Sequence, residues 1–259
     1  MKLIVAFLTM LVGATGAAYA QQPLEPLLYS YRILETYPHS RDAFTQGLFF
    51  HEGALYESTG QYGESSLRLV ELESGEVVRK TDLPQSYFGE GAAHAGGDIF
   101  MLSWREGAAF RFGADDFDLK NSYAYEGEGW GLTYDGEHLI MSDGTPELRF
   151  IDPDSFAEER RLEVTLRGKP LGQLNELEWV DGAIYANVWK TNALVRIDPE
   201  GGAVTAIVDM RGLLEAEDIV PGETDVLNGV AHAGEDDILY VTGKYWPKLF
   251  KIELIEMTN

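Results

Sequence analysis

The sequence predicts an all-β protein, a five-bladed β-propeller with four-stranded blades and a ring closed by the N-terminal strand. Three observations lead to this prediction. Hairpins of one pattern recur five times, at spacings of about 40–53 residues. A third strand follows every hairpin, and a fourth follows four of them. One further strand precedes the first hairpin and belongs to none of the repeats.

Each predicted hairpin is a short apolar strand, a turn rich in Gly, Asp or His, and a second apolar strand. The five hairpins occupy residues 47–59, 91–104, 131–145, 176–189 and 229–244. The last interval is the longest because it contains an insertion, MRGLLEAED at 210–218, for which we expect a helical turn.

The outer strands of the blades follow the hairpins. The predicted third strands are residues 66–73, 108–115, 147–154, 193–200 and 248–255, and the fourth strands are 76–83, 119–125, 160–166 and 203–210. No fourth strand follows the fifth repeat, and the alternating segment YSYRILETY at 29–37 can fill that place. Closing the ring in this way removes an exposed sheet edge. A β-sandwich or a plain meander is the alternative.

The first twenty residues have the features of a secretory leader. A single Lys precedes an apolar run, and small residues follow that end in Ala18, Tyr19 and Ala20. The run is too short for a membrane anchor. We therefore expect a signal peptide at 1–20, a single propeller domain at 21–259 and a periplasmic or secreted bacterial protein. The alternative is a buried N-terminal helix.

The amino-acid composition limits the classes of partner that the protein is expected to bind. The 259 residues include no Cys, so packing alone must hold an exported fold together. The formal net charge of −23 disfavours nucleic acid and anionic membranes as partners, since both require clustered cations. The acidity can equally serve solubility. A closed propeller needs no partner, and we expect a monomer.

One rim of the predicted propeller carries most of the unusual side chains, because the first strand of each blade starts where the second strand ends. The residues at this rim are Phe44, Gln46, Ser58, Thr59, Glu90, Trp104, Glu128, Trp130, Asp143, Thr145, Asn175, Glu176, Trp189, Asn228 and Lys244. The opposite rim holds His51, His94, His138 and His232. We expect these histidines in solvated turns, without a catalytic role.

The rim suggests acid–base chemistry without a conventional nucleophile. The sequence has no nucleophile elbow, P-loop or His-Glu-x-x-His motif. Without Cys or His at this rim, proton transfer must come from a carboxylate or from Lys244. Glu90, in FGEG, is the best placed, because indole walls would raise the pKa of its carboxyl group. The alternative is a solvated glutamate or one that caps a turn.

The tryptophans of this rim predict a binding pocket. Trp104, Trp130 and Trp189 stand at equivalent ends of successive blades, as the walls of an apolar pocket would. Side chains able to donate hydrogen bonds to an oxygen in such a pocket are Gln46, Asn175, Asn228 and Lys244.

Nine short runs resemble the glutaminyl cyclases of the plant and bacterial type, also called glutamine cyclotransferases. They are FTQGL (44–48), LYESTG (55–60), FGEG (88–91), GEGWGLT (127–133), LIMSDGT (139–145), LNELEW (174–179), IYANVW (184–189), VLNGVA (226–231) and TGKYWPKLF (242–250). The resemblance spans about residues 40–254 in register. It implies a five-bladed propeller, unrelated to the zinc-dependent animal enzymes, that cyclises N-terminal glutaminyl residues of peptides or proteins to pyroglutamyl and releases ammonia.

The resemblance also implies roles for individual residues. Glu90 matches the general acid/base of the family. The positions similar to its substrate pocket are Gln46, Trp104, Trp130, Asn175, Trp189 and Lys244, of which Trp104 has the least distinctive context. We expect Glu90, Lys244 and Asn175 to be catalytic, and Phe44 to join Gln46 and the three tryptophans in substrate binding. We expect no cofactor and no catalytic metal. The sequence leaves open whether the protein binds a structural calcium ion.

The sequence leaves two other functions open. Glu90, Asp143, Asn175 and Asn228 would make an oxygen-rich calcium site, as in a metal-dependent lactonase on a propeller. The second alternative is a propeller that binds a ligand or acts as a scaffold, without catalysis.

Overall fold

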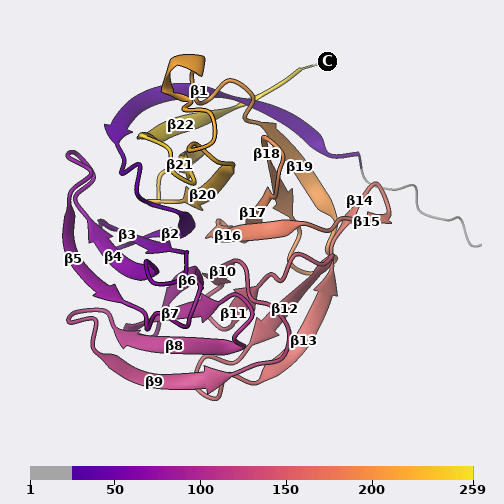
Figure 1. The fold of residues 1–259 in the computed structure, drawn as a ribbon. Coiled ribbons are helices and arrows are strands. Elements are labelled where there is room, and N and C mark those ends of the chain that lie inside the picture. The colour runs from indigo at the N-terminus through magenta and orange to yellow at the C-terminus, as the bar shows by residue number, and fades with distance from the viewer. Residues whose placement is uncertain (1–24, 259) are drawn as a thin grey trace, which may run out of the picture.

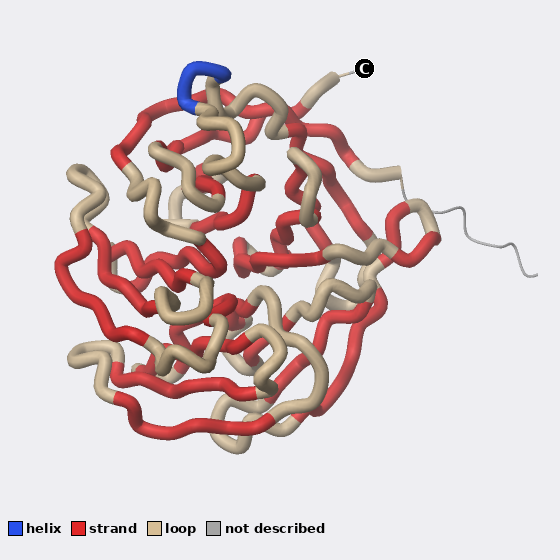
Figure 2. Tube along the Cα trace, viewed as in Figure 1, coloured by secondary structure: helices blue, strands red, loops and turns tan. Residues whose placement is uncertain are grey.

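The computed structural model describes residues 25–258 and is built almost entirely of β-strands (Figure 2). Within that range the single helix is a 3-10 turn, η1 (Ala216–Asp218), inside the insertion where a helical turn is predicted. The all-β prediction is confirmed. The predicted leader at 1–20 lies outside the described residues. No helix of the described part is long and apolar enough to cross a membrane.

Three antiparallel sheets, each of four strands in chain order, make up the first part of the fold (Figure 1). The first contains β2 (Thr45–His51), β3 (Ala54–Thr59), β4 (Ser66–Val70) and β5 (Val77–Asp82). The second contains β6 (Gly89–Ala95), β7 (Asp98–Ser103), β8 (Ala108–Gly113) and β9 (Leu119–Ala124). The third contains β10 (Leu132–Tyr134), β11 (Leu139–Met141), β12 (Glu147–Ile151) and β13 (Glu158–Glu163).

The remaining large sheet has eight strands, in the order β16-β17-β18-β19-β1-β22-β21-β20. One half consists of β16 (Leu174–Val180), β17 (Ala183–Val188), β18 (Ala193–Ile197) and β19 (Val204–Asp209). The other consists of β20 (Leu227–Ala231), β21 (Ile238–Gly243), β22 (Lys248–Glu256) and β1 (Leu27–Pro38). β1 pairs antiparallel with β22 from Tyr29 to Pro38 but parallel with β19 only at its first three residues. The N-terminal strand therefore completes the last four-stranded group.

The strand that was predicted at 160–166 differs in detail. β13 ends at Glu163, and the chain then forms a separate hairpin of β14 (Thr165–Leu166) and β15 (Lys169–Pro170). Arg167 and Gly168 have positive φ angles of 52° and 72°, which turn the chain back on itself. The strand ends early because the backbone N–H of Thr165 donates to the carbonyl of Gly202 (2.8 Å) in the connection before β19, and the chain leaves its pairing with β12.

The first strands of the four-stranded groups close a ring. β2 contacts β6, β6 contacts β10, β10 contacts β16, β16 contacts β20, and β20 contacts β2 again. Figure 1 shows the sheets following one another around this centre in chain order. Buried apolar side chains fill the space between neighbouring sheets: Phe49 and Leu67 of the first sheet share a cluster with Ile99 and Met101 of the second. This packing fixes the strand ends relative to one another.

Glycines allow the close approach at the centre. A Cβ atom added at Gly47 would lie 2.6 Å from the backbone N of Ala92, at Gly91 2.5 Å from that of Leu132, and at Gly131 2.0 Å from the carbonyl oxygen of Asn175. Side chains do not fit at these points, which explains why the hairpins begin with Gly. The equivalent position in β16 is Glu176, whose carboxylate accepts hydrogen bonds from the backbone N–H groups of Leu48 (3.2 Å) and Val230 (2.8 Å).

Candidate active site

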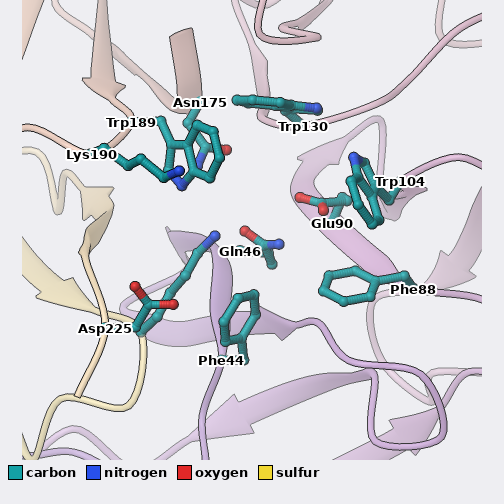
Figure 3. Close-up of a pocket in the computed structure, with 11 residues that line it drawn as sticks. Phe44, Gln46, Phe88, Glu90, Trp104, Trp130, Asn175, Trp189, Lys190 and Asp225 are labelled. Atoms are coloured by element: carbon teal, nitrogen blue, oxygen red, sulfur yellow. The ribbon is translucent and has the colours of Figure 1, made fainter. Parts of the chain in front are cut away.

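A pocket of about 230 Å³ opens at one rim, and every residue for which a catalytic or binding role is predicted lines it (Figure 3). These residues are Phe44, Gln46, Glu90, Trp104, Trp130, Asn175, Trp189 and Lys244. Phe88, Lys190 and Asp225 line it as well and were missed, although Phe88 belongs to the FGEG run and Lys190 directly follows a predicted tryptophan. The structure therefore brings the eight predicted side chains together at one rim.

Irregular pairing aims the polar side chains into the pocket. In β2, β6, β16 and β20 the register shifts near the strand start, between Thr45 and Gly47, Gly89 and Ala92, Leu174 and Leu177, and Leu227 and Val230. Each shift places one extra residue on the first strand, as a β-bulge does, and bulges redirect side chains next to functional sites. Gln46, Glu90, Asn175 and Asn228 all lie within these shifts.

Two aromatic groups form the pocket walls. Trp130 and Trp189 meet edge to face, with ring centroids 5.4 Å apart. Phe88 joins Trp104 and Phe44, with centroid distances of 5.5 and 5.8 Å. The indoles and phenyl rings thus enclose a volume in which a short flexible side chain has few rotamers open to it.

Glu90 is buried in this pocket, with 5% of its surface exposed, and is not the solvated glutamate that the alternative required. Among residues 25–258, no group donates a hydrogen bond to its carboxylate, whereas its backbone carbonyl accepts one from Ser58. Burial raises the pKa of Glu90 well above its usual range, Lys244 opposes the shift, and the charges of Glu128 and Glu106 add to it. A carboxyl group with a raised pKa binds a proton more tightly than a solvated one, as a group that both accepts and donates a proton requires.

Lys244 and Asn175 bring an ammonium group and an amide group to the pocket. The Lys244 side chain is buried, with Nζ 4.5 Å from the centre of the Phe44 ring. Burial lowers the pKa of Lys244, and the charges of Glu90 and Asp225 oppose this shift. Asn175 Oδ1 is buried without a hydrogen-bond partner in the described structure. An amide with an open bonding position in a pocket is suited to a polar ligand.

Asn228 does not line the pocket as the rim prediction implied. Its Nδ2 donates to the backbone carbonyl of Thr45 (2.9 Å) and to Gln46 Oε1 (3.4 Å), so it supports Gln46 from behind. Asp143 is also absent from the lining, and its Oδ1 accepts hydrogen bonds from the N–H and hydroxyl of Thr145. Of the four oxygen ligands of the alternative calcium site, Glu90 and Asn175 line this pocket, whereas Asp143 and Asn228 do not. Within 25–258, no group of three or more His, Asp or Glu side chains is arranged to hold a metal ion.

The histidines of the opposite rim do not line the pocket. They are partly buried and not freely solvated as predicted, because neighbouring turns pack together: the rings of His51 and His94 stack with centroids 3.5 Å apart. The remaining histidine, His39, is buried between Glu57 Oε1 (2.9 Å) and the Trp246 carbonyl (2.7 Å).

Comparison with known proteins shows which family the chain belongs to. The sequence profile of the family described as glutamine cyclotransferase matches residues 4–254. The chain belongs to the glutamine cyclotransferase family. This confirms the resemblance that the nine motifs predict and the assignment as an enzyme of the glutaminyl-peptide cyclotransferase type.

Two relatives of this family cover most of the chain. A glutaminyl-peptide cyclotransferase of Arabidopsis thaliana is 36% identical over 228 residues, which are 86% of this chain and 70% of the plant protein. The crystal structure of Myxococcus xanthus glutaminyl cyclase superposes with a TM-score of 0.85 at 38% identity, covering 90% of this chain and 100% of that one. The similarity therefore extends over the whole ring of sheets.

Proposed function

We propose that the pocket binds the N-terminal glutaminyl residue of a peptide or protein and that Glu90, Lys244 and Asn175 catalyse its cyclisation to pyroglutamyl. The observation that carries this proposal is a buried carboxyl group that accepts no hydrogen bond within residues 25–258, set among aromatic walls and beside the Lys244 ammonium and the Asn175 amide. Phe44, Gln46, Trp104, Trp130 and Trp189 bind the substrate.

The reaction uses the α-amine of the substrate as its nucleophile. With a pKa of about 8 in the free state, this amine is already partly neutral near physiological pH and needs no strong base. The aromatic walls fold the glutamine side chain back toward the amine, which brings the reacting atoms together. The bond between the amine nitrogen and the side-chain carbonyl carbon then forms.

Glu90 transfers the proton that this step releases. Its carboxylate accepts a proton from the attacking nitrogen and gives it to the departing NH₂ group as the carbon–nitrogen bond breaks. Lys244 and the amide N–H groups of Asn175 and Gln46 donate to the oxygen that becomes negative in between. The products are pyroglutamyl peptide and ammonia, and Glu90 returns to its starting state.

We further propose that residues 21–259 form one five-bladed β-propeller that acts as a monomer. Support comes from the closed ring of β2, β6, β10, β16 and β20 and from β1, which completes the last four-stranded group. The leader pattern at 1–20 supports export to the periplasm or beyond.

The test is to mix purified protein with peptides that begin with Gln and to follow both ammonia and the loss of one NH₃ in mass. Turnover that persists in a chelator is expected, because the proposed steps use side chains alone. Loss of turnover that calcium restores, together with lactone hydrolysis, would replace this proposal with the metal-dependent lactonase. Tight peptide binding without ammonia would replace it with a binding propeller.

A further inference from the structure

Glu128 joins two walls of the pocket although it does not line the pocket itself. Its Oε2 accepts hydrogen bonds from the indole N–H groups of both Trp104 (2.8 Å) and Trp130 (3.0 Å). Its Oε1 accepts one from Nε of Arg105 (3.0 Å), and the guanidinium of Arg105 lies 3.6 Å above the Trp104 ring. One carboxylate thus holds two indoles that come from different sheets.

The backbone around Glu128 fixes its place. Gly127 has a positive φ of 88°, and the N–H of Gly129 donates to the carbonyl of Trp104 (2.9 Å). The N–H of Trp130 donates to the carbonyl of Ser142 (2.9 Å). The backbone therefore sets where each tryptophan side chain leaves the chain, and the shared carboxylate adds a hydrogen bond that orients each indole.

We propose that Glu128 is a positioning residue for the reaction, because it locks the indoles of Trp104 and Trp130 into one wall against the substrate side chain. This inference rests on the proposed function of the pocket. A glutamine side chain must fold back on its own amine, and walls that rotate freely would leave it in extended rotamers. Glu128 acts through the tryptophans and does not touch the reacting atoms.

The charge of Glu128 has a second effect, on Glu90. Burial raises the pKa of Glu128, but hydrogen bonds from Trp130, Arg105 and Trp104 outweigh it and the net pKa is lowered, so the group stays ionised. The charged groups that act on Glu90 are Lys244, which stabilises the carboxylate, and Glu128 and Glu106, which destabilise it. Removing the charge of Glu128 should therefore move the Glu90 titration to lower pH.

Three variants separate these effects. Glu128→Ala removes the acceptor and the charge, whereas Glu128→Gln removes the charge and keeps an oxygen that can accept. Glu126→Gln is the matched control, since Glu126 is an exposed glutamate two residues away in the same segment. For each variant, kcat and KM are measured with a Gln peptide across pH, and the indole N–H signals are recorded by NMR without substrate.

We expect Glu128→Ala to lower kcat/KM by about 10- to 100-fold and to shift the two indole N–H signals. Glu128→Gln should move the pH limb that reports Glu90 to lower pH with a smaller loss of kcat/KM. Glu126→Gln should match the wild type in all readouts. Unshifted indole signals in Glu128→Ala, or unchanged kcat/KM and pH profile in both Glu128 variants, would overturn the proposal. Because the NMR measurement needs no turnover, it tests whether Glu128 positions the two indoles even if the proposed reaction fails.

Discussion

Glu90 and Glu176 are buried glutamates at the starts of two first strands, β6 and β16, and they differ in what surrounds their carboxyl groups. Burial raises the pKa of both well above the usual range. Glu176, fully buried at the centre of the ring, accepts hydrogen bonds from the backbone N–H groups of Leu48 and Val230. Glu90 faces the pocket, and its carboxyl group accepts no hydrogen bond from the part of the chain that the structure describes.

The difference shows that a raised pKa alone does not identify a catalytic group. Both carboxyl groups are hard to ionise, because both are removed from water. The Glu176 carboxyl group accepts hydrogen bonds from β2 and β20 and does not line the pocket. Glu90 is free to exchange its proton with a molecule in the pocket. Access and unsatisfied bonding capacity distinguish the two.

The largest expected effect tests Glu90. Glu90→Gln has nearly the same shape but cannot carry a proton, so kcat should fall by about 10²–10⁴-fold or more. Folding should change little, because the carboxylate makes no hydrogen bond that the amide would break. Ammonia release and thermal unfolding measure the two effects. Near-normal turnover would remove Glu90 from the catalytic role and end the contrast with Glu176.

The next largest effect concerns the donors beside Glu90. Lys244→Ala and Asn175→Ala should each raise the barrier by about 2–4 kcal/mol if their side chains stabilise the oxyanion. The loss should appear in kcat, because the oxyanion exists only during the reaction. Steady-state kinetics with one Gln peptide measure it. A rise in KM with unchanged kcat would instead make the affected residue a binder of the ground state.

A smaller effect on turnover is expected at Glu176. Glu176→Gln places an NH₂ group near a backbone N–H that needs an acceptor, which should cost about 1–3 kcal/mol of stability. The kcat of the folded fraction should stay within a few fold of the wild type, because the group does not reach the pocket. Denaturant unfolding and active-site kinetics give the two numbers. Lost turnover at unchanged stability would contradict the structural role.

The repeats predict the ring and the rim that carries the polar and aromatic side chains, because the spacing of the hairpins and the direction of each strand follow from the sequence. The direction of individual side chains is not readable in the same way. The sequence put Glu176 and Asn228 on the rim with Glu90, but bulges in the first strands decide that Glu90 enters the pocket, Glu176 crosses the ring and Asn228 stands behind Gln46. Asp225 was not predicted because it lies between the insertion at 210–218 and β20, in a segment without a periodic signal.

The smallest effect on turnover is expected at Glu178, two residues beyond Glu176 on β16. A change at this residue should instead alter how the stability of the folded chain depends on pH. Burial raises the pKa of Glu178 from 4.5 to about 8, against hydrogen bonds that include one from the His232 N–H. A carboxyl group with a higher pKa in the folded chain binds its proton more tightly there. Its stabilising effect is complete below the unfolded pKa and is lost as the pH rises through the folded value.

Glu178→Gln has no proton to lose at this position, so its Tm relative to the wild type should improve steadily from about pH 5 to about pH 9. The other titrating groups are shared by the two proteins and cancel in the comparison, except Glu176, whose pKa the charge of Glu178 raises, so the difference reports this pair of glutamates. Glu126→Gln, which changes an exposed glutamate, should give a curve parallel to the wild type. Turnover by Glu178→Gln should stay unchanged, since Glu178 does not line the pocket. Parallel Tm curves for Glu178→Gln and wild type would mean that the Glu178 carboxyl group is ionised in the folded chain at neutral pH. Burial on β16 would then not raise the pKa of a glutamate, as it is expected to do both there and on β6.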